Sequence, residues 1–311
     1  MRGYVHLFAF MLLTHCSADE GGVAPGKSAA GGNAGTSGGD AGLGGSSSGG
    51  TSGTGGGVIQ QDGAACVPTH STETECDGVD DDCNGRVDDV DVAKDGICDC
   101  LRIGIIGSPG SNPSANFQAW LQGKGTSVER THQTASESFD APLLSKYDVL
   151  ILDRLPRDYT AAEASALAAW VDAGGGFISM TGYTGQAAPD FFTNTLLAPF
   201  GLSYQPGLKS EPVTTFATHP VTQGLTSVTF LGGYLVADAG GTSGTSTVIG
   251  SISAGPVAYA HERGKGRAVV WGDEWIEFDS EWQSLPEIEQ LWINVMSWLG
   301  PQDSCNVSTP R

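Results

Sequence analysis

The chain has 311 residues, with 35 Asp and Glu against 15 Lys and Arg, and a formal net charge of −20 at pH 7. This excess of carboxylates argues against nucleic-acid binding, which needs clustered Lys and Arg against phosphate. A chain of this length can hold two domains. However, residues 17–60 are dominated by Gly, Ser, Ala and Thr, so we expect one sizeable core, over residues 101–300.

Residues 1–16 are typical of an export leader. One positive charge at Arg2 precedes an apolar run over residues 3–13, which is too short to span a membrane as a helix. The run ends in Leu13-Thr14-His15-Cys16, which resembles a bacterial lipobox, although His15 departs from the small residue usual before the Cys. The resemblance implies export and anchoring to the outer membrane or cell surface through a lipid on Cys16. An ordinary signal peptide cleaved elsewhere is the alternative.

Residues 17–60 have the composition of a flexible tether. They cannot bury enough apolar surface to offset the entropy lost on ordering. We expect a coil with a root-mean-square span of about 35 Å. Gly45-Ser46-Ser47-Ser48-Gly49 matches the Gly-x-Ser-x-Gly turn of hydrolases, but no strand precedes it, so we assign it no catalytic role.

An acidic, cysteine-rich segment covers residues 61–100. From Asp80 onward, oxygen-bearing side chains fall at loop positions one, three, five, nine and twelve, with Gly85 at position six, which is the spacing of a calcium-binding loop. The expected ligands, with Arg86 acting through its carbonyl oxygen, are Asp80, Asp82, Asn84, Arg86, Asp88 and Asp91. A solvated acidic linker that matches by composition is the alternative.

Residues 75–91 also resemble the metal-binding motif of the MopE type. The resemblance is carried by Glu75-Cys76-Asp77-Gly78-Val79-Asp80-Asp81-Asp82-Cys83-Asn84-Gly85 with Val87-Asp88, and Asp89 stands where the family often has Glu. The family name refers to copper. Carboxylates and an amide without His or Met suit calcium better than copper. We therefore predict calcium, bound with an affinity on the order of 0.1–1 mM.

With Cys16 assigned to the leader, an even set of cysteines remains and predicts three disulfides, as expected in an oxidising compartment. These residues are Cys66, Cys76, Cys83, Cys98, Cys100 and Cys305. Sequence alone cannot choose among their possible connectivities. The pairing that we expect is Cys76–Cys83, Cys66–Cys98 and Cys100–Cys305. Zinc is not indicated, because no Cys-x-x-Cys pair or neighbouring His accompanies them.

Strand and helix patterns alternate from Leu101 to the start of a short tail over residues 301–311. Strands are expected over residues 101–107, 128–132, 147–153, 177–181 and 267–273, helices over 114–123, 160–173, 190–200 and 286–299, and β-rich structure over 212–260. Helices between successive strands imply crossover connections. The expected fold class is therefore α/β, with a mainly parallel sheet covered by helices on both faces.

The order of these elements resembles the class I glutamine amidotransferase-like superfamily, and more narrowly its ThuA-like, trehalose-utilisation-type branch. The resemblance is carried by Tyr147-Asp148-Val149-Leu150-Ile151-Leu152, Asp172-Ala173-Gly174-Gly175-Gly176-Phe177, His219-Pro220-Val221-Thr222-Gln223-Gly224-Leu225 and Gly266-Arg267-Ala268-Val269-Val270-Trp271-Gly272-Asp273. It implies a flavodoxin-like sheet. Amidotransferases present a nucleophilic Cys within Gly-x-Cys-x-Gly, whereas the matching turn here, Met180-Thr181-Gly182-Tyr183-Thr184-Gly185, has none. Cys-His catalysis is therefore not expected.

Ligands of open α/β sheets bind beyond the carboxyl ends of the strands. The side chains expected there are Ser108, Asp153, Thr181, Tyr183, Asp273 and Glu274. Such a lining suits a polyol or glycan, and binding without catalysis is the leading hypothesis. The alternatives are a hydrolase that uses Asp273 or Glu274 as acid or base, and an envelope scaffold that binds another protein. His132, His219 and His261 lack a visible nucleophile and orienting group, so structural roles are expected for them.

Overall fold

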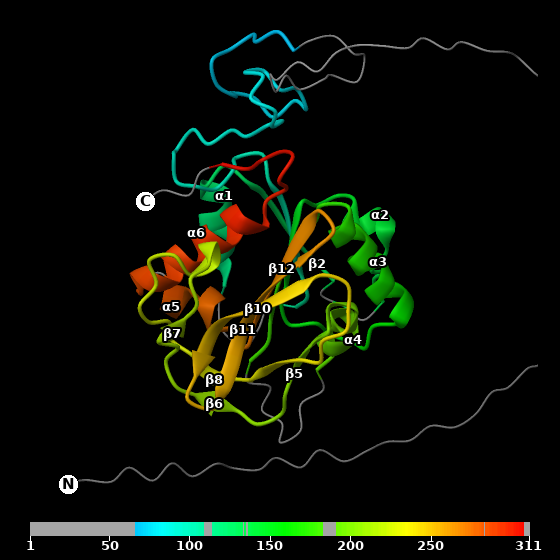
Figure 1. The fold of residues 1–311 in the computed structure, drawn as a ribbon, viewed down its shortest axis with the longest axis vertical. Helices are drawn as coiled ribbons and strands as arrows, with labels where there is room; N and C mark the ends of the chain where they lie inside the picture. The colour runs from blue at the N-terminus through cyan, green and yellow to red at the C-terminus, as the bar shows by residue number, and fades with distance from the viewer. Residues whose placement is uncertain are drawn as a thin grey trace, which may run out of the picture. The chain divides into compact units, whose positions relative to one another are not determined.

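The computed structural model in Figure 1 describes residues 66–108, 114–132, 134, 136–182, 191–282 and 284–307. All of them belong to one compact unit, residues 55–311. Within these ranges no helix is both long and apolar enough to traverse a bilayer. The predicted leader and tether, and the Gly-x-Ser-x-Gly match, lie outside the described residues.

A central sheet is formed by eight of the described strands, in the order β2-β1-β3-β4-β12-β11-β10-β7. The parallel part consists of β1 (Arg102–Ile106), β2 (Ser127–Thr131), β3 (Val149–Leu152), β4 (Gly176–Met180) and β12 (Gly266–Trp271). The antiparallel part consists of β11 (Gly255–Arg263), β10 (Thr245–Ile252) and β7 (Thr215–Phe216). The predicted mainly parallel α/β sheet is thus confirmed.

The interior strands are buried on both faces, because helices cover the sheet on both sides. Every residue of β3 and of β4 is buried, whereas β2 at the edge of the sheet is only partly covered. This is the continuous apolar pattern of parallel strands. Within the sheet, Ile105 of β1 lies opposite Ile151 of β3, so these two neighbouring strands end at the same edge.

Two apolar clusters hold the helices against the sheet. One contains residues of α1 (Ala115–Gly123), α5 (Asp279–Trp282) and α6 (Pro286–Leu299). The other contains residues of α2 (Ala141–Leu144), α3 (Ala161–Asp172) and α4 (Thr193–Leu197). Figure 1 shows these two sets on opposite sides of the sheet. The predicted layering is therefore confirmed.

Local sequence signals explain where α3 begins and why one predicted helix is shorter than expected. The side chain of Thr160 accepts from the backbone N–H of Glu163, and the Glu163 carboxylate accepts from Thr160 N, which together form a capping box. The helix expected over residues 190–200 is instead α4 followed by the 3-10 turn η1 (Ala198–Phe200). Pro199 cannot donate to a continuing helix, and Gly201, with φ of 72°, ends the turn.

The segment between α4 and β12 is β-rich, as predicted. Strands β10 and β11 form a long antiparallel hairpin beside β12. Two small sheets pair β5 (Leu202–Tyr204) with β9 (Val236–Asp238) and β6 (Lys209–Ser210) with β8 (Leu231–Gly233). Two further 3-10 turns are η2 (Pro220–Thr222) and η3 (Trp275–Glu277). The second of them, η3, follows β12 at the edge where the parallel strands end.

Candidate functional site

Charged side chains meet at the carboxyl ends of the parallel strands. Asp153 directly follows β3, and Arg130 lies in β2. After β12, Glu274 stands at the N-cap of η3 and Glu277 is the last residue of η3. All three acids are buried, with exposed fractions of 2% for Asp153, 7% for Glu274 and 0% for Glu277. In the strand order β2-β1-β3-β4, ligands bind where the order reverses, beside β1 and β3. The cluster therefore lies at the position where this fold class binds ligands.

Arg130 is the central cation of this cluster. Its Nη1 donates to Asp153 Oδ2 at 2.6 Å and to the carbonyl oxygen of Gly107 at 3.5 Å. Its Nη2 donates to Ser114 Oγ at 3.4 Å and lies 3.7 Å from Glu277 Oε2. Among the described residues, Asp153 Oδ1 and both carboxyl oxygens of Glu277 accept no hydrogen bond from an N–H group. Buried carboxyl oxygens without a donor cost folding free energy unless a proton is shared between them, and here Glu277 interacts with Asp153 through a side-chain hydrogen bond.

Burial changes the protonation of the acids near Arg130. Desolvation raises the pKa of Glu274 to about 8, and repulsion from Asp153 adds to the effect while Arg154 opposes it. Desolvation also holds the pKa of Glu277 well above its ordinary range, again with repulsion from Asp153. The Glu274 carboxyl group is therefore largely protonated at neutral pH, and Glu277 keeps its proton to a higher pH than an exposed Glu does. A neutral carboxyl group can donate a hydrogen bond or a proton, so perturbed acids in a cleft are functional candidates.

Asp273 has a different environment and holds the turn that presents Glu274. Its Oδ2 accepts from Leu231 N, and its Oδ1 accepts from Trp275 N at 3.1 Å. Burial raises the pKa of Asp273 to about 7, although these backbone donors lower it. On the other side, a Cβ added to Gly182 would lie 2.7 Å from Glu274 Cγ, so the turn after β4 packs directly against Glu274. The Glu274 carboxyl group is thus fixed between the ends of β4 and β12.

The other residues predicted for the cleft are distributed around this cluster. The Ser108 hydroxyl donates to Arg154 O at 3.3 Å and joins the segments after β1 and β3. Thr181 is half-buried directly after β4, and Tyr183 lies outside the described residues. Sequence reasoning missed Arg130 and Glu277. A charged residue inside a strand pattern was the available signal for Arg130.

The histidines take part in structural contacts. The ring of His132 is buried, and its Nε2 lies 2.7 Å from Ser138 O. His219 accepts from Val221 N and caps η2. His261 pairs with Ser246 Oγ at 2.9 Å and Ser243 O at 3.2 Å. Burial lowers the pKa of both His219 and His261, so these rings are neutral near pH 7.

The cysteine-rich segment forms three disulfides, as predicted, but their pairing differs from the prediction. The bonds are Cys66–Cys83, Cys76–Cys100 and Cys98–Cys305. The predicted pairs Cys76–Cys83, Cys66–Cys98 and Cys100–Cys305 are wrong. The C-terminal tail explains part of the difference. Ser304 forms an isolated parallel β-bridge with Val87, and Cys305 N donates to Val87 O at 3.1 Å. These contacts place Cys305 beside Cys98.

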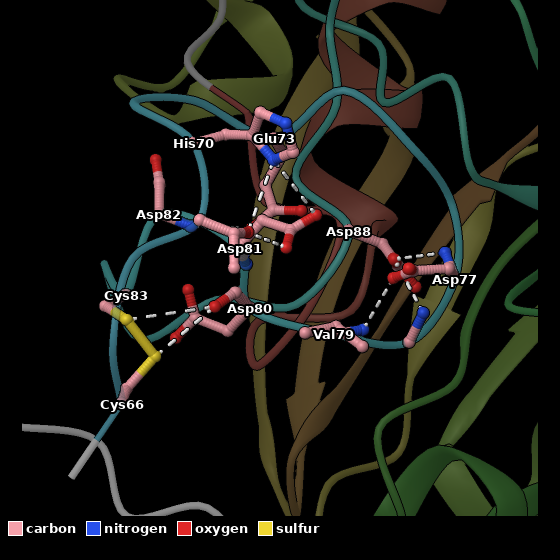
Figure 2. Close-up of polar contacts among 12 residues, drawn as sticks. Cys66, His70, Glu73, Asp77, Val79, Asp80, Asp81, Asp82, Cys83 and Asp88 are labelled. Carbon is pink, nitrogen blue, oxygen red and sulfur yellow. Dashed lines mark hydrogen bonds and ion pairs between the residues drawn. A yellow bond between two sulfur atoms is a disulfide. The ribbon is translucent and has the colours of Figure 1, made fainter.

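Three of the six predicted metal ligands, Asp80, Asp88 and Asp91, hold backbone turns. Asp80 and Asp91 use both carboxylate oxygens, and Asp88 uses one. Asp80 accepts from Asn84 N at 3.1 Å and Gly85 N at 3.0 Å, and this tight turn presents Cys83 to Cys66. Asp91 accepts in the same way from Asp95 N and Gly96 N. Figure 2 shows the Asp88 carboxylate beside Asp77, whose N–H it accepts at 2.9 Å.

The remaining predicted ligands lie near a carboxylate that the sequence did not single out. Ligand oxygens of Glu73, Asp82 and Asp89 all lie within 4.8 Å of one another. Asn84 Nδ2 donates to Asp89 Oδ2 at 3.1 Å, and Arg86 lines the same cavity. Desolvation raises the pKa of both Glu73 and Asp89, with repulsion from Asp82 contributing in each case. A second cluster, Cys98, Cys100 and Cys305, is occupied by disulfide bonds and offers no thiolate.

Comparison with known proteins gives a family match and a set of similar structures. The family model described as "Domain of unknown function (DUF4350)" matches residues 106–277. No curated protein matches the chain. The mmIFT52 N-terminal domain is 14% identical with a TM-score of 0.49, over 63% of this chain and 96% of that chain.

Two further solved structures carry the name of the branch that the sequence resembles. A ThuA-like protein from Bacteroides uniformis is 17% identical with a TM-score of 0.42, over 64% of this chain and 90% of that chain. A ThuA-like protein from Parabacteroides merdae is 12% identical with a TM-score of 0.41, over 68% of this chain and 93% of that chain.

Proposed function

This chain belongs to the family described as a domain of unknown function (DUF4350), and we propose that its α/β domain binds a small hydroxylated ligand, such as a glycan, without turning it over. The proposal extends to the rest of the chain. The protein is exported, is anchored to the outer membrane or cell surface through a lipid on Cys16, and binds calcium in its cysteine-rich segment.

The observation that carries the ligand proposal is the buried charge cluster around Arg130. Asp153 and Glu277 are closed to solvent, and their carboxyl groups interact with each other through a side-chain hydrogen bond that helps to raise the pKa of Glu277. Glu274, at 7% exposure, is the least buried acid of the cluster and the one nearest to solvent. Ligand hydroxyl groups can both donate to and accept from such carboxyl groups. A hydroxylated ligand therefore suits the cluster better than an apolar one.

The residues of the turn that follows β4 support ligand binding rather than acyl transfer. Residues 180–185 carry no Cys, and the six cysteines of the described ranges are all disulfide-bonded. A thiolate nucleophile would need a free Cys with a base beside it. Recognition at this edge of the sheet therefore uses carboxyl groups, with no covalent intermediate on sulfur.

The test is calorimetric titration of soluble glycans and polyols into the full chain with Cys16→Ser, which removes the acceptor of the lipid. Glu274→Gln keeps the size of the side chain but changes its hydrogen bonding, and it should weaken binding at least tenfold. Glu262→Gln changes an exposed acid on β11 and serves as the matched control. If no compound of a broad panel releases or absorbs heat, the ligand proposal is wrong and an envelope scaffold is favoured.

Hydrolysis is the second candidate, and the protonation of Glu274 favours it. An acid with a pKa of about 8 is protonated at neutral pH and can donate a proton to a leaving group. Release of the chromophore from aryl glycosides by the wild-type chain, lost in Glu274→Gln and retained in Glu262→Gln, would identify a hydrolase. Binding without release of the chromophore supports the non-catalytic proposal.

Three disulfides support export, because such bonds form and persist in oxidising compartments. Anchoring is tested by metabolic labelling with a fatty acid and by cell fractionation. The wild-type chain should carry the label in the membrane fraction, and the Cys16→Ser variant should be unlabelled. Labelling of the Cys16→Ser variant, or an unlabelled wild-type chain, would refute the lipid anchor.

A further inference from the structure

One carboxylate of the cysteine-rich segment is buried without a complete set of hydrogen bonds. Glu73 is 7% exposed, and its Oε1 accepts from Asp81 N at 2.5 Å and Asp82 N at 3.3 Å. Its Oε2 is buried and has no hydrogen-bond partner among the described residues. Figure 2 shows the Glu73 side chain directed at the backbone of Asp81 and Asp82. A buried carboxylate oxygen with no donor needs a cation or a proton.

Two further carboxylates converge on Glu73. Ligand oxygens of Glu73, Asp82 and Asp89 lie within 4.8 Å of one another, and all three residues line one cavity of about 670 Å³. Two oxygens that each lie about 2.4 Å from a calcium ion can be at most about 4.8 Å apart. Each pair of carboxylates therefore meets this limit, and all three contact one ion once their oxygens lie within about 4.2 Å of one another. Without an ion, three like charges at this distance repel one another.

Three carboxylates of the consecutive loop hold backbone turns. Both oxygens of Asp80 and both oxygens of Asp91 accept backbone N–H groups, and Asp88 Oδ1 accepts from Asp77 N and Gly78 N. These bonds shape the segment around the cavity. Asp82 and Asp89 each use one oxygen in a hydrogen bond with Asn84, at Asp82 Oδ1 and Asp89 Oδ2, and each has a second oxygen for a cation. Their oxygens converge with those of Glu73, and of these three residues only Asp82 belongs to the regular loop spacing.

We propose that Glu73, Asp82 and Asp89 form a binding site for a hard divalent cation of the calcium class, in place of the ligand set that the loop spacing predicts. All three members of the group are carboxylates, a ligand set that selects such a cation over zinc or copper, and His70, whose Nδ1 lies 3.9 Å from Asp81 Oδ2, does not belong to it. Water molecules complete its coordination in the cavity. The inference rests on the proposed calcium-binding function and specifies which residues perform it.

The site also lies where the C-terminal tail meets the cysteine-rich segment. Asn306 and Val307 line the same cavity, and Arg86 Nη1 donates to Asn306 O at 2.6 Å. A cation that binds the folded chain and not the unfolded chain stabilises the fold by mass action. Calcium binding should therefore stabilise the junction between the two segments, and thermal unfolding reports on it.

The experiment titrates calcium chloride into the chelator-treated full chain with Cys16→Ser, by calorimetry and by thermal unfolding. Glu73→Gln and Asp89→Asn should each weaken calcium binding at least tenfold and reduce the calcium-dependent rise in melting temperature. Asp88→Asn removes one negative charge from the same segment and is the matched control, with an expected change in affinity below threefold. Disulfide mapping of each variant establishes that the segment has folded, and two independent ligand variants guard against a folding failure of either one.

The outcomes separate this inference from the broader proposal. Weak binding by Glu73→Gln and Asp89→Asn together with normal binding by Asp88→Asn supports the site. If Asp88→Asn and Asp91→Asn abolish binding while Glu73→Gln binds normally, the consecutive loop holds the ion, and this inference fails while the calcium function stands. If the wild-type chain shows neither heat nor a shift in melting temperature with calcium, both fail.

Discussion

Arg130 and Asp153 form an ion pair of 2.6 Å between side chains that are only 10% and 1% exposed. Arg130 lies in β2 and Asp153 follows β3, so the pair crosses the carboxyl end of β1, the strand between them. Burying two charges costs several kcal/mol in desolvation, of the order described for ion pairs in general. The pair therefore stabilises the fold only as long as both partners are present, and its removal tests how far the cluster constrains the sheet.

Replacing Arg130 with Met should destabilise the protein by about 3–5 kcal/mol, because Asp153 would remain as a buried charge without its partner. Urea unfolding at pH 7 measures the loss. The control is Arg102→Met, which breaks the pair of Arg102 with Asp148, also 2.6 Å long but with Arg102 53% exposed. Exposed pairs contribute about 0–1 kcal/mol. Equal losses in the two variants would contradict the assignment of a desolvated pair.

Replacing Glu274 with Gln should change how stability depends on pH. The folded-state pKa of about 8 lies above the ordinary value of 4.5, so the folded chain holds the proton of Glu274 more tightly than the unfolded chain does. The stabilising contribution of Glu274 to the free energy of unfolding is fully present below pH 4.5 and is lost as the pH rises toward 8. The variant has no such titration. Its unfolding free energy relative to wild type should therefore rise between pH 5 and pH 8, by about 1–4 kcal/mol.

The measurement is chemical denaturation of wild type and Glu274→Gln at several pH values, compared as a difference so that other titrating groups cancel. Glu262→Gln is the control, because Glu262 is exposed. A difference between wild type and Glu274→Gln that stays constant over the whole range would show that Glu274 ionises normally in the folded protein.

Replacing Thr160 with Ala should lower the free energy of unfolding by about 1 kcal/mol, because the first turn of α3 loses its side-chain cap. Thr160 Oγ1 accepts from Glu163 N at 3.2 Å. The matched control is Ser165→Ala in the same helix, whose hydroxyl donates to Ala161 O at 2.8 Å within the helix. Thermal unfolding of both variants is sufficient. A larger loss in Ser165→Ala than in Thr160→Ala would refute the importance of the cap.

Elements with a complete local signal could be predicted from the sequence. The apolar run of β3 and the amphipathic stripe of α6 each match one period, and packing agrees with that period. Asp153 and Glu274 were predicted in the cleft because acids that follow parallel strands must lie at one edge of the sheet. Tertiary structure then determined what these acids contact.

Contacts between distant segments could not be predicted. The pattern of β2 does not specify which neighbour Arg130 faces, and Glu277 lies in a short turn without periodicity. Glu73 precedes the acidic loop, so loop spacing gave no reason to include it. The disulfide pairing failed for the same reason, because Cys305 reaches Cys98 only after the tail pairs with Val87.

The Cys98–Cys305 disulfide should contribute more to stability than the Cys66–Cys83 disulfide. The two bonds close loops of 207 and 17 residues. In the chain-entropy account, these loops correspond to about 5 and about 3 kcal/mol. The double variant Cys98→Ala with Cys305→Ala should therefore lower the unfolding free energy more than Cys66→Ala with Cys83→Ala, measured in urea without reductant. Cys98 and Cys305 are both buried, so removing their sulfur atoms lowers the unfolding free energy further. Peptide mapping of wild type should recover Cys98 linked to Cys305, and recovery of Cys100 linked to Cys305 instead would refute both the pairing and this order of stability.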